Sequence, residues 1–121
     1  FLYLENDDLC LRKKKENKKI YIVKKAKINH LGGMSHAINH EKEIEFSRNW
    51  HWMWSKFYFN KKHYGYLKTF TSSLPSLFIS GIKFFYYLIT KNKYKKKIYM
   101  MRFLGLFNSM LNKKAWYRPK V

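Results

Sequence analysis

The chain contains very little cysteine and, over most of its length, no acidic residues. Its one cysteine, Cys10, excludes an internal disulfide bond and fits a reducing compartment. All seven carboxylates lie at or before Glu45. Noncovalent contacts must therefore hold any fold together, and the C-terminal two thirds must tolerate a field of one sign.

The positive charge is concentrated in the region without acids. The 26 Lys and Arg residues give the 121-residue chain a formal net charge of +19. Up to Glu45, ten of them stand against seven acids and leave +3, whereas the sixteen from Phe46 onward stand alone as +16. Such a field attracts the phosphates of nucleic acid or of an anionic lipid leaflet. A compositional bias toward Lys, Asn, Ile, Tyr and Phe accounts for part of this excess of positive charge.

The N-terminal third predicts strands and a short helix. Residues 1–4 read as a short strand before a polar loop, and a helical turn or two follows from Leu9. The β-forming residues 20–23 begin an extended stretch that runs to His30 and ends at Gly32.

Three helices are predicted further along. Large apolar residues recur with helical spacing over 43–63, and Gly65 ends that helix. The most apolar run, 74–90, reads as a helix that starts near Pro75 and carries Lys83 near its middle. At that length it falls short of a bilayer span, which favours a helix lying in the membrane interface or packed on protein. A last amphipathic helix is expected over 98–111.

Four blocks of the sequence together resemble one enzyme family. The blocks are FLYLENDDLCLR, KIYIVKKAKINHLGGMSH, SRNWHWMWSKFYFNKKHYGYL and LGLFNSMLNKKAWYRP. In that order they are similar to the C-terminal third of bacterial family 2 glycosyltransferases, and especially to rhamnosyltransferase-type members that build surface polysaccharides. The resemblance covers nearly the whole chain, and four ordered blocks are more specific than any one block.

The resemblance implies a fold and an activity. Residues 1–40 would be the C-terminal edge of a GT-A nucleotide-diphospho-sugar transferase domain, and 41–121 a basic, aromatic-rich, mainly helical tail. The donor-binding half, with its Asp-x-Asp metal motif, would lie upstream of Phe1. The parent enzyme would be an inverting transferase that moves a sugar from a nucleotide-sugar donor to a polysaccharide or lipid-linked acceptor. The fragment alone would be inactive.

The general base is expected in the acidic cluster near the start. The family pattern is Glu-Asp-x-Asp-Leu followed by Arg, and here Glu5-Asn6-Asp7-Asp8-Leu9 precedes Arg12. Because the amide of Asn6 cannot accept a proton, the role falls to Asp7 or Asp8, with Asp7 preferred and Glu5 beside them. Alternatively, the two aspartates cap a helix, where an anion contributes about 0.3–1 kcal/mol. A calcium loop is disfavoured because no ligand spacing extends past Asp8.

A metal ligand and an acceptor groove also follow from the resemblance. His30 would complete the site of a divalent cation, Mg²⁺ or Mn²⁺, held mostly by the upstream domain; the alternative is a structural histidine. Arg48, His51 and Trp52 would line the acceptor groove. The tryptophans of this segment equally suit a helical core or a membrane surface.

Basic runs flank the two apolar helices, at Lys61–Lys62, Lys91–Lys97 and Lys113–Lys114. They predict peripheral attachment to the anionic, cytoplasmic face of the bacterial inner membrane, with helices embedded shallowly beside a lipid-linked acceptor. An ordinary solvated face is the alternative.

Two rival functions remain open. A ribosome-associated nucleic-acid-binding module would use the basic tail and its aromatics. The apolar run 74–90 is too long for a solvated RNA platform, so no nucleic acid is expected. A non-catalytic membrane-associating segment would explain residues 66–112 but not the acidic cluster.

Overall fold

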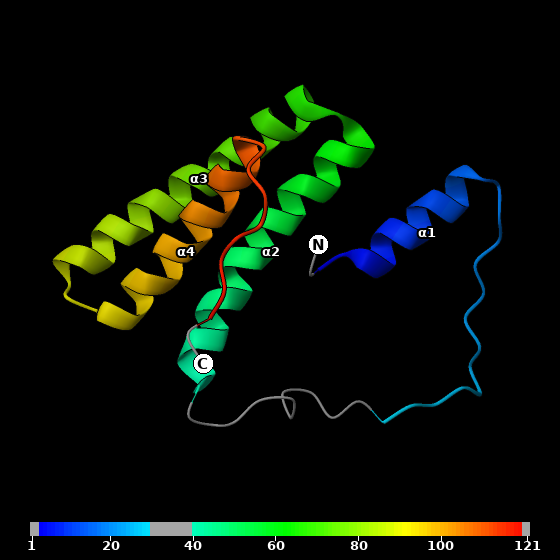
Figure 1. Ribbon diagram of the computed structural model, residues 1–121, viewed down its shortest axis with the longest axis horizontal. Coiled ribbons are helices and arrows are strands. Elements are labelled where there is room, and N and C mark those ends of the chain that lie inside the picture. The colour runs from blue at the N-terminus through cyan, green and yellow to red at the C-terminus, as the bar shows by residue number, and fades with distance from the viewer. Residues whose placement is uncertain (1–2, 30–39, 120–121) are drawn as a thin grey trace.

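The structure, a computed structural model, describes residues 3–29 and 40–119, and the regular secondary structure within these ranges is helical. No strand occurs in the described residues. The helices are α1 (Glu5–Lys15), α2 (Glu41–Tyr64), α3 (Tyr66–Ile89) and α4 (Lys93–Met110) (Figure 1).

The predicted α/β edge of a GT-A domain is therefore wrong. The β-forming residues 20–23 are exposed, with Ile22 91% accessible, and have no strand beside them. A strand is stabilised by cross-strand pairs and by burial, so β-propensity without a partner does not make a sheet. Tyr3 and Leu4 form a bend, and α1 begins directly at Glu5. The division of the chain at residue 40 stays a prediction.

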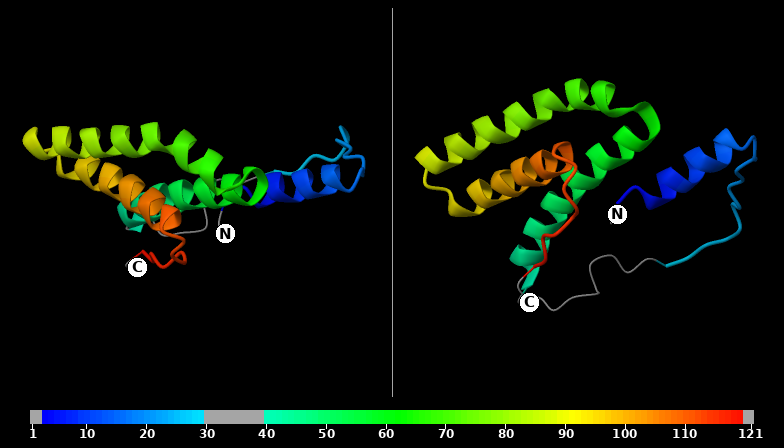
Figure 2. Two further views of the ribbon diagram at one scale, coloured as in Figure 1. Left: turned by 90° about the horizontal axis from the view of Figure 1, so that it is seen from above. Right: turned by 45° about the horizontal axis from the view of Figure 1, so that its top comes forward.

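Helix α4 packs between α2 and α3 and forms the centre of a three-helix unit (Figures 1 and 2). The closest approach is at Gly105 in α4, where a Cβ atom would overlap the backbone of Trp50 in α2. Trp50 is fully buried. Only a residue without a side chain lets the two helix backbones meet at this point.

Apolar side chains from the three helices form two adjoining clusters. Around Trp50 these are Phe46, Trp54 and Met101. Around Phe57 they are Met53, Leu106 and Met110, against which Phe70, Leu74 and Leu77 of α3 pack. The periodic apolar positions predicted for 43–63 thus supply the core of the unit, and that helix is confirmed.

Gly65 separates α2 from α3 by a single residue. Its φ of 86° lies in the region that side chains disfavour, which explains why glycine occupies this sharp reversal. The structure confirms the predicted end of the helix here.

Helix α3 starts at Tyr66, well before the predicted start near Pro75, which lies inside the helix. Tertiary contacts account for the early start. The Tyr66 hydroxyl donates to the Met110 carbonyl at 3.0 Å, and Thr69 is 1% exposed. With 24 residues, α3 is about 36 Å long at roughly 1.5 Å per residue.

Helix α4 also begins earlier than predicted, within the lysine run. The Asn92 side chain accepts a hydrogen bond from the Lys95 amide at 3.0 Å and caps the helix. After α4 the chain turns back and runs along α2 (Figure 1). There the Trp54 indole donates to the Lys113 carbonyl at 3.0 Å, and His51 Nε2 lies 2.9 Å from the Tyr117 carbonyl.

Candidate functional site

The predicted acidic cluster lies on α1, and its members have different surroundings. Glu5 and Asp7 are exposed, whereas Asp8 is 5% exposed. One oxygen of Asp8 lies 2.7 Å from Lys62 Nζ and 2.8 Å from His63 Nε2, both on α2. Its other oxygen accepts a hydrogen bond from Arg12 Nε at 3.0 Å. Asp8 thus joins α1 to the end of α2.

These partners hold the pKa of the Asp8 carboxyl well below its usual range. The hydrogen bond from Lys62 has the largest effect, and those from His63 and Arg12 act in the same direction, because each favours the charged carboxylate. Burial raises the pKa but does not cancel this effect. A weakly basic carboxylate is a poor general base. The contacts are those of an anchor between two helices. No side-chain hydrogen bond caps the start of α1, but Glu5, Asp7 and Asp8 all lie in its first turn, where carboxylates interact favourably with the helix dipole.

His63 completes the anchor. Its side chain is 2% exposed, and its Nδ1 lies 3.4 Å from Lys15 Nζ. An ammonium group can only donate, so this contact fits the tautomer in which Nδ1 accepts from Lys15 and Nε2 donates to Asp8. His63 was not among the site residues predicted from the sequence. Its signal was only a histidine at the end of an aromatic-rich helix.

The predicted metal ligand His30 lies outside the described residues. Among residues 3–29 and 40–119, no group of three His, Cys, Asp or Glu side chains is placed to hold a metal ion. The divalent cation stays a prediction.

The structure brings together two of the three residues expected in the acceptor groove. Arg48 and Trp52, one helical turn apart on α2, line an open depression of about 240 Å³ with Tyr3, Glu45 and Asn49. The indole of Trp52 is 42% exposed, and the Tyr3 ring meets it edge-on with centroids 5.7 Å apart.

His51 faces the other way, beneath the C-terminal segment. Burial lowers the pKa of His51, and its hydrogen bond to the Tyr117 carbonyl opposes that shift only in part. Its contacts are those of a core histidine.

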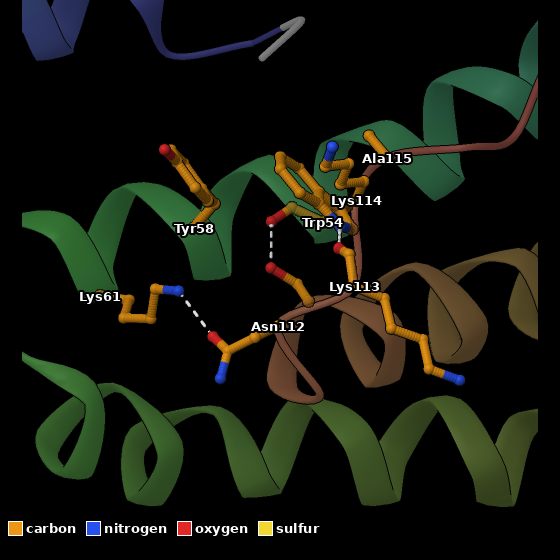
Figure 3. Close-up of a pocket in the computed structure, with 8 residues that line it drawn as sticks. Trp54, Tyr58, Lys61, Asn112, Lys113, Lys114 and Ala115 are labelled. Carbon is orange, nitrogen blue, oxygen red and sulfur yellow. Dashed lines mark hydrogen bonds between the residues drawn. The ribbon is translucent and has the colours of Figure 1, made fainter.

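A basic, aromatic pocket that the sequence analysis missed opens between α2 and the residues after α4 (Figure 3). It has a volume of about 310 Å³. Trp54 and Tyr58 form one wall, stacked with centroids 5.0 Å apart. Lys61 donates to Asn112 Oδ1 at 2.6 Å. The remaining lining residues are Ser109, Lys113, Lys114 and Ala115.

The third feature is an apolar face of α3, called here the outer face. It consists of residues that are 52–79% exposed: Leu67, Phe78, Ile79, Ile82, Phe85 and Ile89. Among the described residues, α3 is the one helix whose length and composition would suffice to cross a bilayer, with a mean hydropathy of 1.2 over a stretch of 18 residues.

Lys83, near the middle of α3, makes its contacts with α4. Its ammonium group lies 3.4 Å from the Tyr99 hydroxyl and 5.2 Å from the centre of the Tyr99 ring. This charge is therefore held along the seam between the two helices and leaves the outer face apolar.

No model of a known protein family, no curated protein and no solved structure matches this chain. The resemblance to family 2 glycosyltransferases thus rests on the four sequence blocks.

Proposed function

We propose that this chain attaches peripherally to an anionic membrane surface through α3, whose outer face enters the lipid. The single observation that carries the proposal is the exposure of the outer face: six large apolar side chains on one helix are each more than half accessible. Large exposed apolar patches are rare on soluble monomers and mark contacts with proteins or membranes.

The two sides of α3 support a helix lying in the membrane plane. Phe70, Leu74 and Leu77 pack on the α2–α4 core, so one side of the helix is committed to protein. The outer face remains for lipid. Amphipathic helices of this kind bury their apolar side shallowly at the boundary between headgroups and acyl chains.

The charge distribution supports an anionic lipid surface rather than a hydrophobic protein partner. Neither α3 nor α4 contains a carboxylate. The turn between them and the first turns of α4 carry a cluster of exposed or half-exposed lysines, namely Lys91, Lys93, Lys95, Lys96 and Lys97. Basic residues near an anionic leaflet contribute about 1 kcal/mol each. We place the chain at the cytoplasmic leaflet for this reason, because that leaflet is the negatively charged one.

Vesicle binding of the full chain tests the proposal. We expect sedimentation with vesicles of phosphatidylcholine and phosphatidylglycerol, and less with phosphatidylcholine alone. The double variant Ile82→Gln/Phe85→Gln should bind at least about tenfold more weakly, because each buried apolar side chain contributes roughly 1.5–3 kcal/mol.

The matched control is Ile22→Gln/Ile28→Gln, which removes two apolar side chains that are about 90% exposed in the extended segment. It should bind like the unchanged chain. Equal binding of the two double variants would contradict insertion of the outer face.

A second candidate function is that of a C-terminal part of an inverting glycosyltransferase that acts on a saccharide or lipid-linked acceptor. What supports it is the depression in which Arg48 and Trp52 open to solvent together. An exposed indole can stack on a sugar ring, and a guanidinium can donate to its hydroxyls. Both candidates place the chain at a membrane, so they are compatible.

Saccharide titration of the full chain tests this candidate. Oligosaccharides containing rhamnose should shift the Trp52 indole signal in NMR spectra. Trp52→Ala should abolish the response of the neighbouring Arg48, whereas Tyr21→Ala, which removes a 76% exposed aromatic ring elsewhere, should not. Unchanged saccharide binding in Trp52→Ala would remove the depression from the proposal.

A further inference from the structure

We propose that the pocket between α2 and the residues after α4 binds a phosphate monoester, with Lys61 and Lys114 as the cationic groups and Trp54 and Tyr58 as the wall for its organic part. This site goes beyond membrane attachment, because none of its lining residues belongs to the outer face of α3.

The first support is the fixed position of the Lys61 ammonium. It is held by the Asn112 side chain at 2.6 Å and lies 5.5 Å from the centre of the Tyr58 ring. Its partner Asn112 is neutral. A cation held in place by an amide and a ring keeps its charge uncompensated, which favours an anion beside it.

The second support is the way the C-terminal segment is fastened. The Trp54 indole donates to the Lys113 carbonyl at 3.0 Å, and the Ser109 hydroxyl donates to the Trp54 carbonyl at 2.9 Å. These bonds place Lys114 beside the indole, while the Lys113 side chain runs away from it (Figure 3). Two neighbouring lysines thus have different relations to the pocket.

The third support is the match of charge and size. Lys61 and Lys114 both line the pocket, and their two positive charges suit a phosphate monoester, which carries about −1.5 to −2 at pH 7, better than a single carboxylate. None of the described residues that line the pocket carries a carboxylate. Its volume of about 310 Å³ is at the small end of ligand sites, which suits a phosphorylated ring or polyol.

The phosphate could belong to a free metabolite or to a lipid headgroup, and titrations of the full chain in neutral phosphatidylcholine bicelles distinguish these sources. The probes are adenosine 5′-monophosphate, adenosine and, in a second arm, phosphatidate added to the bicelles. The readout is the NMR signal of the Trp54 indole N–H, assigned with Trp54→Phe.

We expect saturable shifts with the monophosphate and none with adenosine. Lys114→Gln and Lys61→Gln should each weaken binding about tenfold, because a charge-assisted hydrogen bond is lost. The matched control Lys113→Gln removes the same charge from the adjacent residue. It should weaken binding of the monophosphate less than about threefold, because only the long-range attraction of one positive charge is lost. If phosphatidate displaces the monophosphate, the site takes a lipid headgroup; if it does not, the site takes a free ester.

Equal losses in Lys113→Gln and Lys114→Gln would show general electrostatic attraction and would overturn the site. So would the absence of a saturable response to either phosphate probe at millimolar concentration. Neither result changes the expectation for Ile82→Gln/Phe85→Gln, so failure of this site and failure of membrane attachment are distinguishable.

Discussion

Helix α1 and the three-helix unit of α2, α3 and α4 are held in place by different forces. The unit is joined by apolar packing around Trp50 and Phe57 and by the close backbone contact at Gly105. Among the described residues, helix α1 is joined to α2 chiefly through Asp8, with further contacts between Tyr3 and Trp52 and between Lys15 and His63. Apolar packing depends on shape, whereas an ionic anchor depends on pH and on single charges.

The largest expected effect is at the helix crossing inside the unit. Gly105→Ala should destabilise the chain by about 3 kcal/mol or more, because the new Cβ would overlap the Trp50 carbonyl and push α4 from α2. Denaturant unfolding in a neutral detergent, followed by circular dichroism, measures this loss.

Gly81→Ala is the matched control for that substitution. Its Cβ would meet the Phe103 ring at 3.8 Å, an ordinary contact, and alanine favours a helix over glycine by about 1 kcal/mol. We expect unchanged or slightly raised stability. A similar loss in both variants would contradict the close approach at Gly105.

The next effect concerns α1 alone. Asp8→Asn removes the charge that Lys62, His63 and Arg12 surround, so α1 should detach while the unit stays folded. Hydrogen exchange should accelerate over 5–15 and stay unchanged in α2 and α4. Asp7→Asn, the same change at the adjacent exposed position, should leave α1 protected. Faster exchange in both regions would show that the two are one cooperative body.

The smallest expected effect is that α1 and the three-helix unit lose stability in different pH ranges. The folded-state pKa of Asp8 is lowered, so its stabilising effect is present above the unfolded value near 3.9 and is lost as the pH falls below it. Burial lowers the pKa of His51 in the folded chain. As the pH falls below about 6.5, His51 therefore takes up a proton more readily in the unfolded chain than in the folded one, and the three-helix unit loses stability.

Denaturant unfolding and hydrogen exchange at pH 8, 5.5 and 3 measure the stability of the three-helix unit and the protection of α1 in each range. Between pH 8 and 5.5 the unit should weaken slightly while α1 stays docked, and α1 should detach only in the acidic range. His51→Gln should remove the first change and keep the second. Loss of α1 protection already at pH 5.5 would contradict the role given to Asp8.

The sequence predicted the helices best where their own residues supply the core. Phe46, Trp50, Met53 and Phe57 recur with helical spacing and are buried on one side of α2. Prediction from the sequence failed where a contact with another segment of the chain decides the structure. Residues 20–23 favour a strand, but no strand lies beside them among the described residues. The start of α3 was missed because the contact from Tyr66 to the end of α4 is not local.

The candidate sites divide in the same way. The apolar run 74–90, which contains every residue of the outer face except Leu67, and its basic flanks were predicted from the sequence. Arg48 and Trp52 share a depression because they lie four residues apart on one helix. The phosphate pocket was not predictable, because folding brings Lys61 and Lys114 to it from segments more than fifty residues apart.

The sequence by itself determined the charge asymmetry, the apolar composition of α3 and the apolar stripe of α2, since these depend on residue order within one segment. Only the tertiary structure decided that Asp8 is an anchor, that His51 is buried and that Trp54 meets Lys113. Each of these depends on a contact between distant segments, and such contacts form only when the helices pack.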